Sequence, residues 1–546
     1  MSDSNIRSRR PGSERPDRNE LWTRFSSPRW RPSAAGITID VSRMDFDEAF
    51  LERSEPLVEA ALRERDRIEA GERVNVTEDR MVGHYWLRDP QRAPDPAIRR
   101  QIEEAVTQVT AFVNDVHEGR VAPPQAARFT DVVLIGIGGS ALGPQLVADG
   151  LGQSTDAMTL HFLDNTDPDG VDRLLDDLGS RLNATLVLVV SKSGGTRETH
   201  CGMLEMTRAF ENRGLSFPAQ AVAITQQDSR LDRLAREDGW LVRMPMWDWV
   251  GGRTSVTSAV GLLPAALQGV DVQALLGGAA SMDARTRTDT VDMNPALLLA
   301  LMWHWEISEQ GRREMVVLPY KDRLLLLPRY LQQLVMESLG KRLDHDGEVV
   351  HQGITVYGNK GTTDQHAYMQ QLLDGPAGFF ATFLVVLEDR RPDRSVDQVE
   401  DDSGTTTGDY LHGFWQGTRD ALYDRGRESI SIMINRLDAR SLGALIALYE
   451  RAVGFYASFI NINAYDQPGV ELAKKAAQSV IDIQVRVLSY LSDHPDGATI
   501  EALGVAIEAP DRLESIHHVL EHLVANGRGI EKTDGKYRRA SVIAST

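Results

Sequence analysis

The chain has 546 residues, too many for one ordinary core, and its length predicts roughly two to four domains. Its formal net charge of -19 at pH 7 opposes general binding to nucleic acid, so we expect no nucleic-acid partner. The single cysteine, Cys201, excludes an internal disulfide and a cysteine-rich zinc cluster, and fits a reducing compartment. Long apolar runs and an N-terminal apolar signal core are both missing from the sequence. We therefore expect a cytoplasmic protein without a membrane segment.

The N-terminal part of the chain divides into two segments of different character. Residues 1–36 are rich in Arg, Ser and Pro, a composition that buries little apolar surface and predicts a disordered basic tail. Residues 37–128 show a mainly helical pattern, with two amphipathic stretches on either side of Trp86, Leu87 and Arg88. We expect a helical segment ahead of the main body of the protein.

From Phe129 onward, β-branched runs alternate with helical patterns, which indicates an α/β fold with two doubly wound, mainly parallel sheets. In a first domain, residues 129–295, strands are expected at 132–137, 160–163, 184–190, 221–224 and 241–244. In a second domain, residues 296–483, they are expected at 315–318, 354–357, 379–387 and 430–434. Residues 484–546 follow the order helix, helix, helix, hairpin, which suggests a winged-helix-like extension.

Two glycine-rich turns follow predicted strands of the first domain. Ser191, Lys192, Ser193 and Thr196 surround a pair of glycines at the start of a helix, where backbone N–H groups, hydroxyls and the helix dipole favour a phosphate. The earlier turn, which contains Gly139 and Ser140, reads as a GxGxxA dinucleotide fingerprint or as part of a sugar-phosphate site.

Six segments of the chain together resemble the glucose-6-phosphate isomerase (phosphoglucose isomerase) family, in that family's order and spacing. They are GIGGSALG from Gly136, SKSGGTRET from Ser191, GGRTSVTSAVGL from Gly251, QQLVMESLGK from Gln332, TTDQHAYMQQL from Thr362 and DQPGVELAKK from Asp466. The resemblance implies two sugar-isomerase (SIS) domains, a homodimer, a sugar-phosphate substrate, and no cofactor or metal.

Isomerisation of an aldose to a ketose requires a base beside the carbonyl and electrophilic help for an enediolate. Glu337 is the candidate base, on a helix that Pro328 can start and Gly340 can end. Gln333 lies one turn earlier on the same face, and the resemblance implies that it holds substrate. By the same resemblance, Arg253 lies over the enediolate.

The resemblance gives three further side chains a role. His366 would serve ring opening and would reach the site from the other subunit of the dimer, Lys474 would assist at the ring oxygen, and Gln467 would contact the phosphate. Ser191, Lys192, Ser193 and Thr196 would form the main phosphate cradle. Lys475, beside Lys474, faces elsewhere on a helix and is expected to have no role.

The sequence thus predicts reversible conversion of D-glucose 6-phosphate to D-fructose 6-phosphate through an enediolate, in glycolysis and gluconeogenesis. Two other hypotheses stay open: a sugar-phosphate sensor that binds without turnover, and an NAD-dependent oxidoreductase based on the first glycine turn alone. The sensor has no need of Glu337, Arg253, His366 and Lys474 together, and the oxidoreductase leaves five of the six segments unexplained. Activity on mannose 6-phosphate also stays open.

Overall fold

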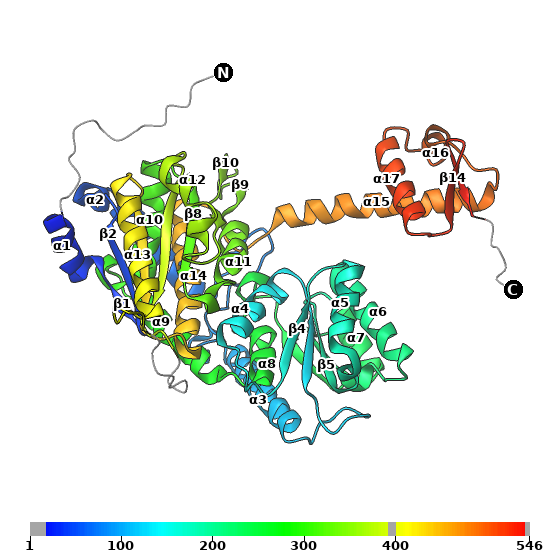
Figure 1. Cartoon of the computed structure of the whole chain (residues 1–546), viewed down its shortest axis with the longest axis horizontal. Helices are drawn as coiled ribbons and strands as arrows, with labels where there is room; N and C mark the ends of the chain where they lie inside the picture. The colour runs from blue at the N-terminus through cyan, green and yellow to red at the C-terminus, as the bar shows by residue number, and fades with distance from the viewer. Residues whose placement is uncertain (1–17, 391–399, 541–546) are drawn as a thin grey trace. The chain divides into compact units, whose positions relative to one another are not determined.

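A computed structural model describes residues 18–390 and 400–540 of the chain (Figure 1). The described residues form two compact units, one that ends at Asp466 and one that begins at Gln467. Both predicted sheets lie in the first unit. The first 17 residues of the predicted disordered tail lie outside the described residues.

The first sheet contains five parallel strands in the order β4-β3-β5-β6-β7, and all five predicted strands of this domain are confirmed. Alternate residues of β3 face opposite sides, because Val133 packs with the helices of one layer and Val132 with those of the other. The strand order reverses between β3 and β5, and both glycine-rich turns leave the sheet at that point. The strands are β3 (Asp131–Ile135), β4 (Thr159–Leu163), β5 (Thr185–Val190), β6 (Ala221–Gln226) and β7 (Val242–Met246).

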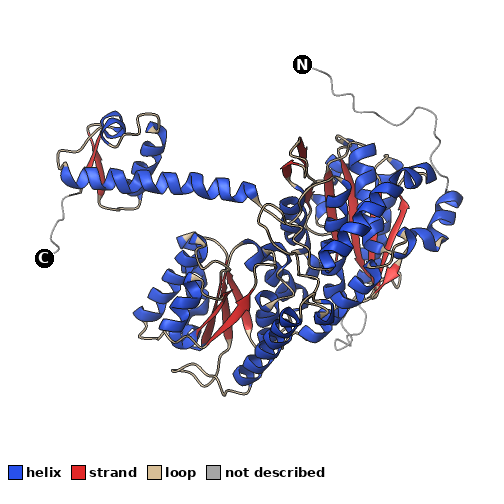
Figure 2. Cartoon of the chain, turned by 180° about the vertical axis from the view of Figure 1, so that it is seen from behind, coloured by secondary structure: helices blue, strands red, loops and turns tan. Residues whose placement is uncertain are grey.

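The second sheet contains six strands in the order β1-β2-β13-β12-β8-β11. Its four predicted strands are confirmed and run parallel, as β8 (Glu314–Tyr320), β11 (Thr355–Tyr357), β12 (Phe379–Val386) and β13 (Ser429–Ile434). Figure 2 shows both sheets lying between helices.

The expected disorder of residues 18–36 and the helical assignment of residues 37–43 were both wrong. Residues 18–36 include α1 (Arg18–Ser26) and β1 (Ser33–Ala34), and β2 (Ile37–Arg43) joins the edge of the second sheet, antiparallel to β13. Ile37, Ile39 and Val41 alternate along β2 and are fully buried. Their period of two residues is the signal for a strand, and its partner lies at the other end of the unit in sequence.

The remaining helices of the first unit pack around the sheets, and α2 and α3 confirm the helical pattern on either side of Trp86. They are α2 (Glu48–Glu69), α3 (Pro96–His117), α4 (Leu142–Leu151), α5 (Pro168–Leu178), α6 (Arg197–Asn212), α7 (Arg230–Glu237), α8 (Ala259–Gln268), α9 (Val272–Thr286), α10 (Pro295–His304), α11 (Leu327–Leu331), α12 (Met369–Asp374), α13 (Thr407–Asp424) and α14 (Ala439–Phe459). A two-stranded antiparallel hairpin, β9 (Lys341–Leu343) and β10 (Val349–Gln352), follows the helix that carries Glu337.

The second unit has its own core, formed by residues such as Val487, Leu491, Leu503 and Leu520. Its elements are α15 (Pro468–Asp493), α16 (Ile500–Ala506), α17 (Leu513–Ala525) and the hairpin of β14 (Ile530–Thr533) and β15 (Lys536–Arg539). The unit begins earlier than residue 484, because α15 is one continuous helix through that position. None of the helices in the described parts of the chain is both long and apolar enough to cross a membrane.

Helices α9 and α14 pack against each other through glycines. A Cβ atom on Gly278 would lie 1.8 Å from the carbonyl oxygen of Arg440, and one on Gly443 would lie 1.9 Å from that of Leu275. No side chain fits at either contact. Gly277, the neighbour of Gly278 on the same helix, has more space, since the nearest atom to a Cβ there is the Arg440 side-chain nitrogen at 3.5 Å.

We predict that Gly278→Ala lowers the free energy of unfolding by about 3 kcal/mol, because the two helices must move apart to admit a methyl group. Gly277→Ala is the matched control. It should leave stability unchanged or raise it by up to about 1 kcal/mol through the helix propensity of alanine. Thermal unfolding of both variants beside the wild type measures the difference, and equal midpoints for the two variants would contradict the close helix contact.

Candidate active site

Three of the six segments converge where β3 ends. Gly139 touches the backbone of the Gly251 segment, because a Cβ atom on Gly139 would lie 2.1 Å from the carbonyl carbon and oxygen of Gly252. Ser255 reinforces this contact by donating a hydrogen bond from Oγ to the Gly139 carbonyl at 3.3 Å. Gly138 has φ +57°, and a Cβ there would lie 3.1 Å from Nε2 of Gln333. The turn that contains Gly139 and Ser140 therefore lies against both Arg253 and Gln333.

Arg253 and Glu337 form a buried ion pair at this junction. Nε of Arg253 lies 3.2 Å from Oε2 of Glu337, and the side chain of Arg253 is only 5% exposed. The guanidinium also donates to the carbonyls of Ala464 at 2.8 Å and Asp466 at 3.0 Å, and to Oγ of Ser338 at 3.3 Å. Burial lowers the pKa of Arg253, and the Glu337 carboxylate acts in the opposite direction. One charged side chain thus joins segments that are 211 positions apart.

Glu337 lies in a π-helical turn, Gln332–Glu337, which continues α11. The predicted helix is present, but no sequence pattern indicated its wider turn. Nε2 of Gln333 donates to Oε2 of Glu337 at 2.9 Å, so Gln333 and Arg253 hold the same carboxylate oxygen. Oε1 makes no hydrogen bond or ion pair within the described residues. Such turns are frequent at functional sites, and this one leaves one oxygen of the Glu337 carboxylate without a partner in the described chain.

Lys341 is a residue of the site that the sequence reasoning missed. Its ammonium donates to the Glu337 carbonyl at 2.8 Å and to the Asp466 carbonyl at 3.0 Å, and lies 3.3 Å from Oδ1 of Asp466. Burial lowers the pKa of Lys341, and the nearby Arg253 lowers it further. Lys341 is the first residue of β9, four positions after Glu337, and no local sequence pattern marks it as part of the site.

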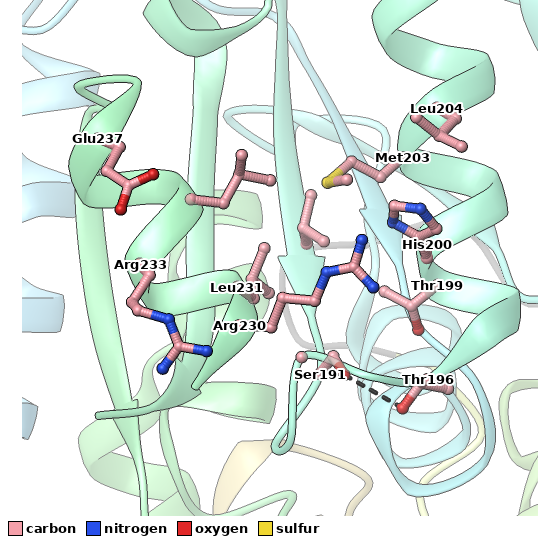
Figure 3. Close-up of a pocket in the computed structure, with 13 residues that line it drawn as sticks. Ser191, Thr196, Thr199, His200, Met203, Leu204, Arg230, Leu231, Arg233 and Glu237 are labelled. Carbon is pink, nitrogen blue, oxygen red and sulfur yellow. Dashed lines mark hydrogen bonds between the residues drawn. The ribbon is translucent and has the colours of Figure 1, made fainter. Parts of the chain in front are cut away.

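The predicted phosphate cradle, residues 191–196, forms a tight turn between β5 and α6. Oγ of Ser191 donates to Oγ1 of Thr196 at 3.1 Å (Figure 3), and Oγ of Ser193 accepts from the N–H of Gly195 at 3.1 Å. Gly194 has φ +67°, and a Cβ there would lie 2.4 Å from the backbone nitrogen of Leu231, so this position requires glycine.

Lys192 turns its ammonium toward a loop that lies before Arg253. It donates to the carbonyls of Asp248 at 3.0 Å and Val250 at 2.9 Å. Burial lowers the pKa of Lys192 to about 8, and the charge of Arg80 lowers it further. An ammonium has three donors, and two of them are used here.

The other predicted residues lie apart from this cluster or in the second unit. His366 is exposed, in a short turn (Asp364–His366), and within the described residues its side chain makes no hydrogen bond or ion pair with Glu337 or Arg253. The helix after it, α12, is only six residues long and begins at Met369. Gln467 and Lys474 belong to the second unit, so their roles stay predictions.

In the dinucleotide-binding alternative, Asp164 would be the acidic residue that binds the ribose, but in this structure it is bonded to two other side chains. Asp164 follows β4, where a dinucleotide-binding domain has a carboxylate for the ribose hydroxyls. Here Oδ2 of Asp164 accepts from Gln145 at 2.8 Å and from Arg329 at 3.2 Å. Within the described part of the chain, no group of three or more His, Cys, Asp or Glu side chains could hold a metal ion.

Comparison with known proteins agrees with this geometry. The family model described as "Phosphoglucose isomerase" matches residues 40–401 and 417–499. The chain belongs to the phosphoglucose isomerase family. A protein named glucose-6-phosphate isomerase from Nostoc punctiforme is 52% identical over 97% of this chain and 99% of its own length. One of the same name from a Geobacter species is 53% identical over 95% of this chain and 99% of its own.

A solved structure of the family has the same fold. The crystal structure of a glucose-6-phosphate isomerase from Chlamydia trachomatis superposes with a TM-score of 0.76 at 28% identity. The match covers 85% of this chain and 92% of that one.

We predict that Gly139→Ala lowers both stability and turnover, because its Cβ would displace the Gly252 carbonyl and with it Arg253. A loss of about 2 kcal/mol in the free energy of unfolding is expected, together with a fall in kcat of at least tenfold. Gly252→Ala is the control for stability, since a Cβ on Gly252 would have no atom within 4 Å. A stable, fully active Gly139→Ala variant would contradict the backbone contact.

Proposed function

We infer that this chain is a glucose-6-phosphate isomerase, which interconverts glucose 6-phosphate and fructose 6-phosphate. The observation that carries the inference is the arrangement of Glu337 between Gln333 and Arg253, beside the glycine turn after β3. Membership of the family supports the same conclusion.

The geometry around Glu337 suggests how the proton moves. Oε2 is held by Gln333 and Arg253, so we assign proton transfer to Oε1, which takes the proton from C2 of the open sugar and returns it to C1. Negative charge then develops on the two oxygens of the enediolate. The fixed guanidinium of Arg253 stabilises that charge, and it needs no reorganisation because its other donors are already bound.

Phosphate binding is assigned to the cradle and the adjacent glycine turn. Ser191, Ser193 and Thr196 offer hydroxyls at the start of α6, and the helix dipole adds to them. The third donor of the Lys192 ammonium is available to a phosphate oxygen. Gly139 and Ser140 complete the proposed cradle from the end of β3.

The remaining steps are proposals based on the family resemblance. His366 assists ring opening from a second copy of the chain in a homodimer, and its exposure is consistent with a role at such an interface. Lys474 acts at the ring oxygen, and Gln467 contacts the phosphate. The winged-helix-like second unit serves as a structural or oligomer-contact extension, and the protein works in the cytoplasm.

The decisive experiment measures conversion of fructose 6-phosphate to glucose 6-phosphate by purified protein without added metal or nucleotide. Turnover under these conditions supports the isomerase. Binding of fructose 6-phosphate without conversion would favour a sugar-phosphate sensor instead, and a dependence on nicotinamide nucleotide would favour an oxidoreductase.

We predict that Glu337→Gln lowers kcat by several orders of magnitude, because the amide cannot accept the C2 proton. The amide oxygen can still accept hydrogen bonds from Gln333 and Arg253, so the variant should remain folded. Glu348→Gln is the matched control, since Glu348 is an exposed carboxylate on the loop between β9 and β10. Near-normal turnover by folded Glu337→Gln would refute the assignment of the base.

We also predict that substrate affinity falls as the pH rises above about 8, the pKa of Lys192. The protonated ammonium attracts the substrate phosphate and the neutral amine does not, so binding is strongest below this pKa and weakens above it. KM for fructose 6-phosphate should rise about tenfold across this titration, with kcat nearly constant. In Lys192→Met, KM should be high at every pH, whereas Lys475→Met should keep the wild-type profile. An unchanged pH profile in Lys192→Met would exclude Lys192 from the cradle.

A further inference from the structure

A cavity of about 370 Å³ lies between α6 and α7, over the end of β5 (Figure 3). The volume falls within the range of pockets that hold small molecules. One end of the cavity is formed by Ser191 and Thr196 of the cradle turn, but Glu337, Arg253 and Gln333 are not among its lining residues. The cavity therefore borders the proposed active site without including the catalytic cluster, and nothing in the proposed mechanism uses it.

The walls of the cavity are mainly apolar. Met203 and Leu204 come from α6, Leu231 and Leu234 from α7, and Val189 from β5. Leu204 is 53% exposed, so its side chain lies at the rim of the cavity, in contact with solvent. These side chains can cover a flat apolar group of a ligand and remove it from water.

Arg230 supplies a positive charge to this apolar cavity. Figure 3 shows its guanidinium between the two helices, on the side of the cavity near Thr199 and His200. Within the described residues, Arg230 makes no hydrogen bond or ion pair. His200 is not a competing cation, because burial lowers its pKa and the charges of Arg230 and Arg197 lower it further. The donors of Arg230 are therefore available to an anion.

Thr199 lies near Arg230 in the wall of the cavity, but its hydroxyl does not face the cavity. The residue is 3% exposed, and its Oγ1 is buried. At the other end of the cavity, Glu237 is accompanied by Arg233, which donates to the Asp228 carbonyl. Among the described residues that line the cavity, Arg230 is thus the cation without a hydrogen bond or ion pair, and an anionic group is best placed beside it.

We propose that this cavity binds a small organic anion, with its carboxylate, sulfonate or phosphate group at Arg230 and its apolar part against Met203, Leu204 and Leu231. Occupancy raises KM for the sugar phosphate, because an anion beside the cradle turn repels the substrate phosphate. The effect on KM rests on the proposed isomerase function, whereas the binding itself does not.

The structure contains the connections that such coupling needs. The Ser191–Thr196 hydrogen bond belongs both to the cradle turn and to the wall of the cavity. Gly194 packs directly on the backbone of Leu231, with no room for a Cβ. Movement of α7 on ligand binding would thus be passed to the turn that holds the phosphate.

Binding is tested with anilinonaphthalene sulfonate, an apolar aromatic anion whose fluorescence rises when it leaves water. The full-length wild type is titrated beside Arg230→Ala, with Arg236→Ala as the matched control. Arg236 lies on the same helix, pairs with Asp228 at 3.7 Å and does not line the cavity. We expect Arg230→Ala to weaken binding at least about tenfold and Arg236→Ala to leave it unchanged. Equal affinities for wild type and Arg230→Ala, or equal losses in both variants, would overturn the site.

The kinetic test follows fructose 6-phosphate turnover with and without a saturating concentration of the probe. The expected result is a several-fold rise in KM with unchanged kcat in the wild type, and no rise in Arg230→Ala. If the probe binds through Arg230 and KM does not change, the proposed coupling is wrong. If the protein does not convert fructose 6-phosphate, the proposed function is wrong. The binding titration still shows whether the cavity binds the probe through Arg230.

Discussion

The buried guanidinium of Arg253 is the contact on which the rest of the site depends. A charge removed from water is tolerated only when it is paired and its donors are satisfied. Arg253 meets both conditions with the Glu337 carboxylate, the hydroxyl of Ser338 and the carbonyls of Ala464 and Asp466. These partners come from two stretches that lie far apart in the sequence, one at Glu337 and Ser338 and the other at Ala464 and Asp466. Leaving the guanidinium or one of these partners buried and unpaired would cost free energy, and this cost helps to keep the segments together.

The second buried cation makes the arrangement around Glu337 more rigid. Lys341 binds the Glu337 carbonyl and both the carbonyl and carboxylate of Asp466, so the segment that Arg253 holds is also held from the other side. Burial is the main cause of the lowered pKa of Lys341, and repulsion between these two neighbouring cations lowers it further. The carboxylates of Glu337 and Asp466 compensate for this repulsion. Asp466 is also the last residue of the first unit, so these bonds hold the chain at the end of that unit.

The sequence predicted the strands well and the details of the site less well. The central runs that became β3, β5 and β12 could be predicted because parallel strands buried on both faces are continuously apolar, a signal that needs no tertiary information. Strand β2 was missed, although its residues alternate, because its partner β13 lies far away in sequence. The π-helical turn of Glu337 was also missed, since local propensity does not distinguish it from an α-helix. Lys341 and the two carbonyl contacts of Lys192 arise only when distant loops meet.

The division of labour between the two oxygens of Glu337 links structure to chemistry. A base that pairs with arginine through both oxygens is held well but is a weak proton acceptor, because the ion pair stabilises the charged form. A base with no partner is reactive but poorly positioned. Here Gln333 and Arg253 share Oε2 and leave Oε1 without a partner in the described chain. The π-helical turn places Gln333 and Glu337 so that this shared contact forms within one helix. In the proposed mechanism, positioning and reactivity thus belong to different atoms of the same carboxylate, and the fixed charge of the guanidinium that holds one oxygen stabilises the charge that the other creates on the substrate.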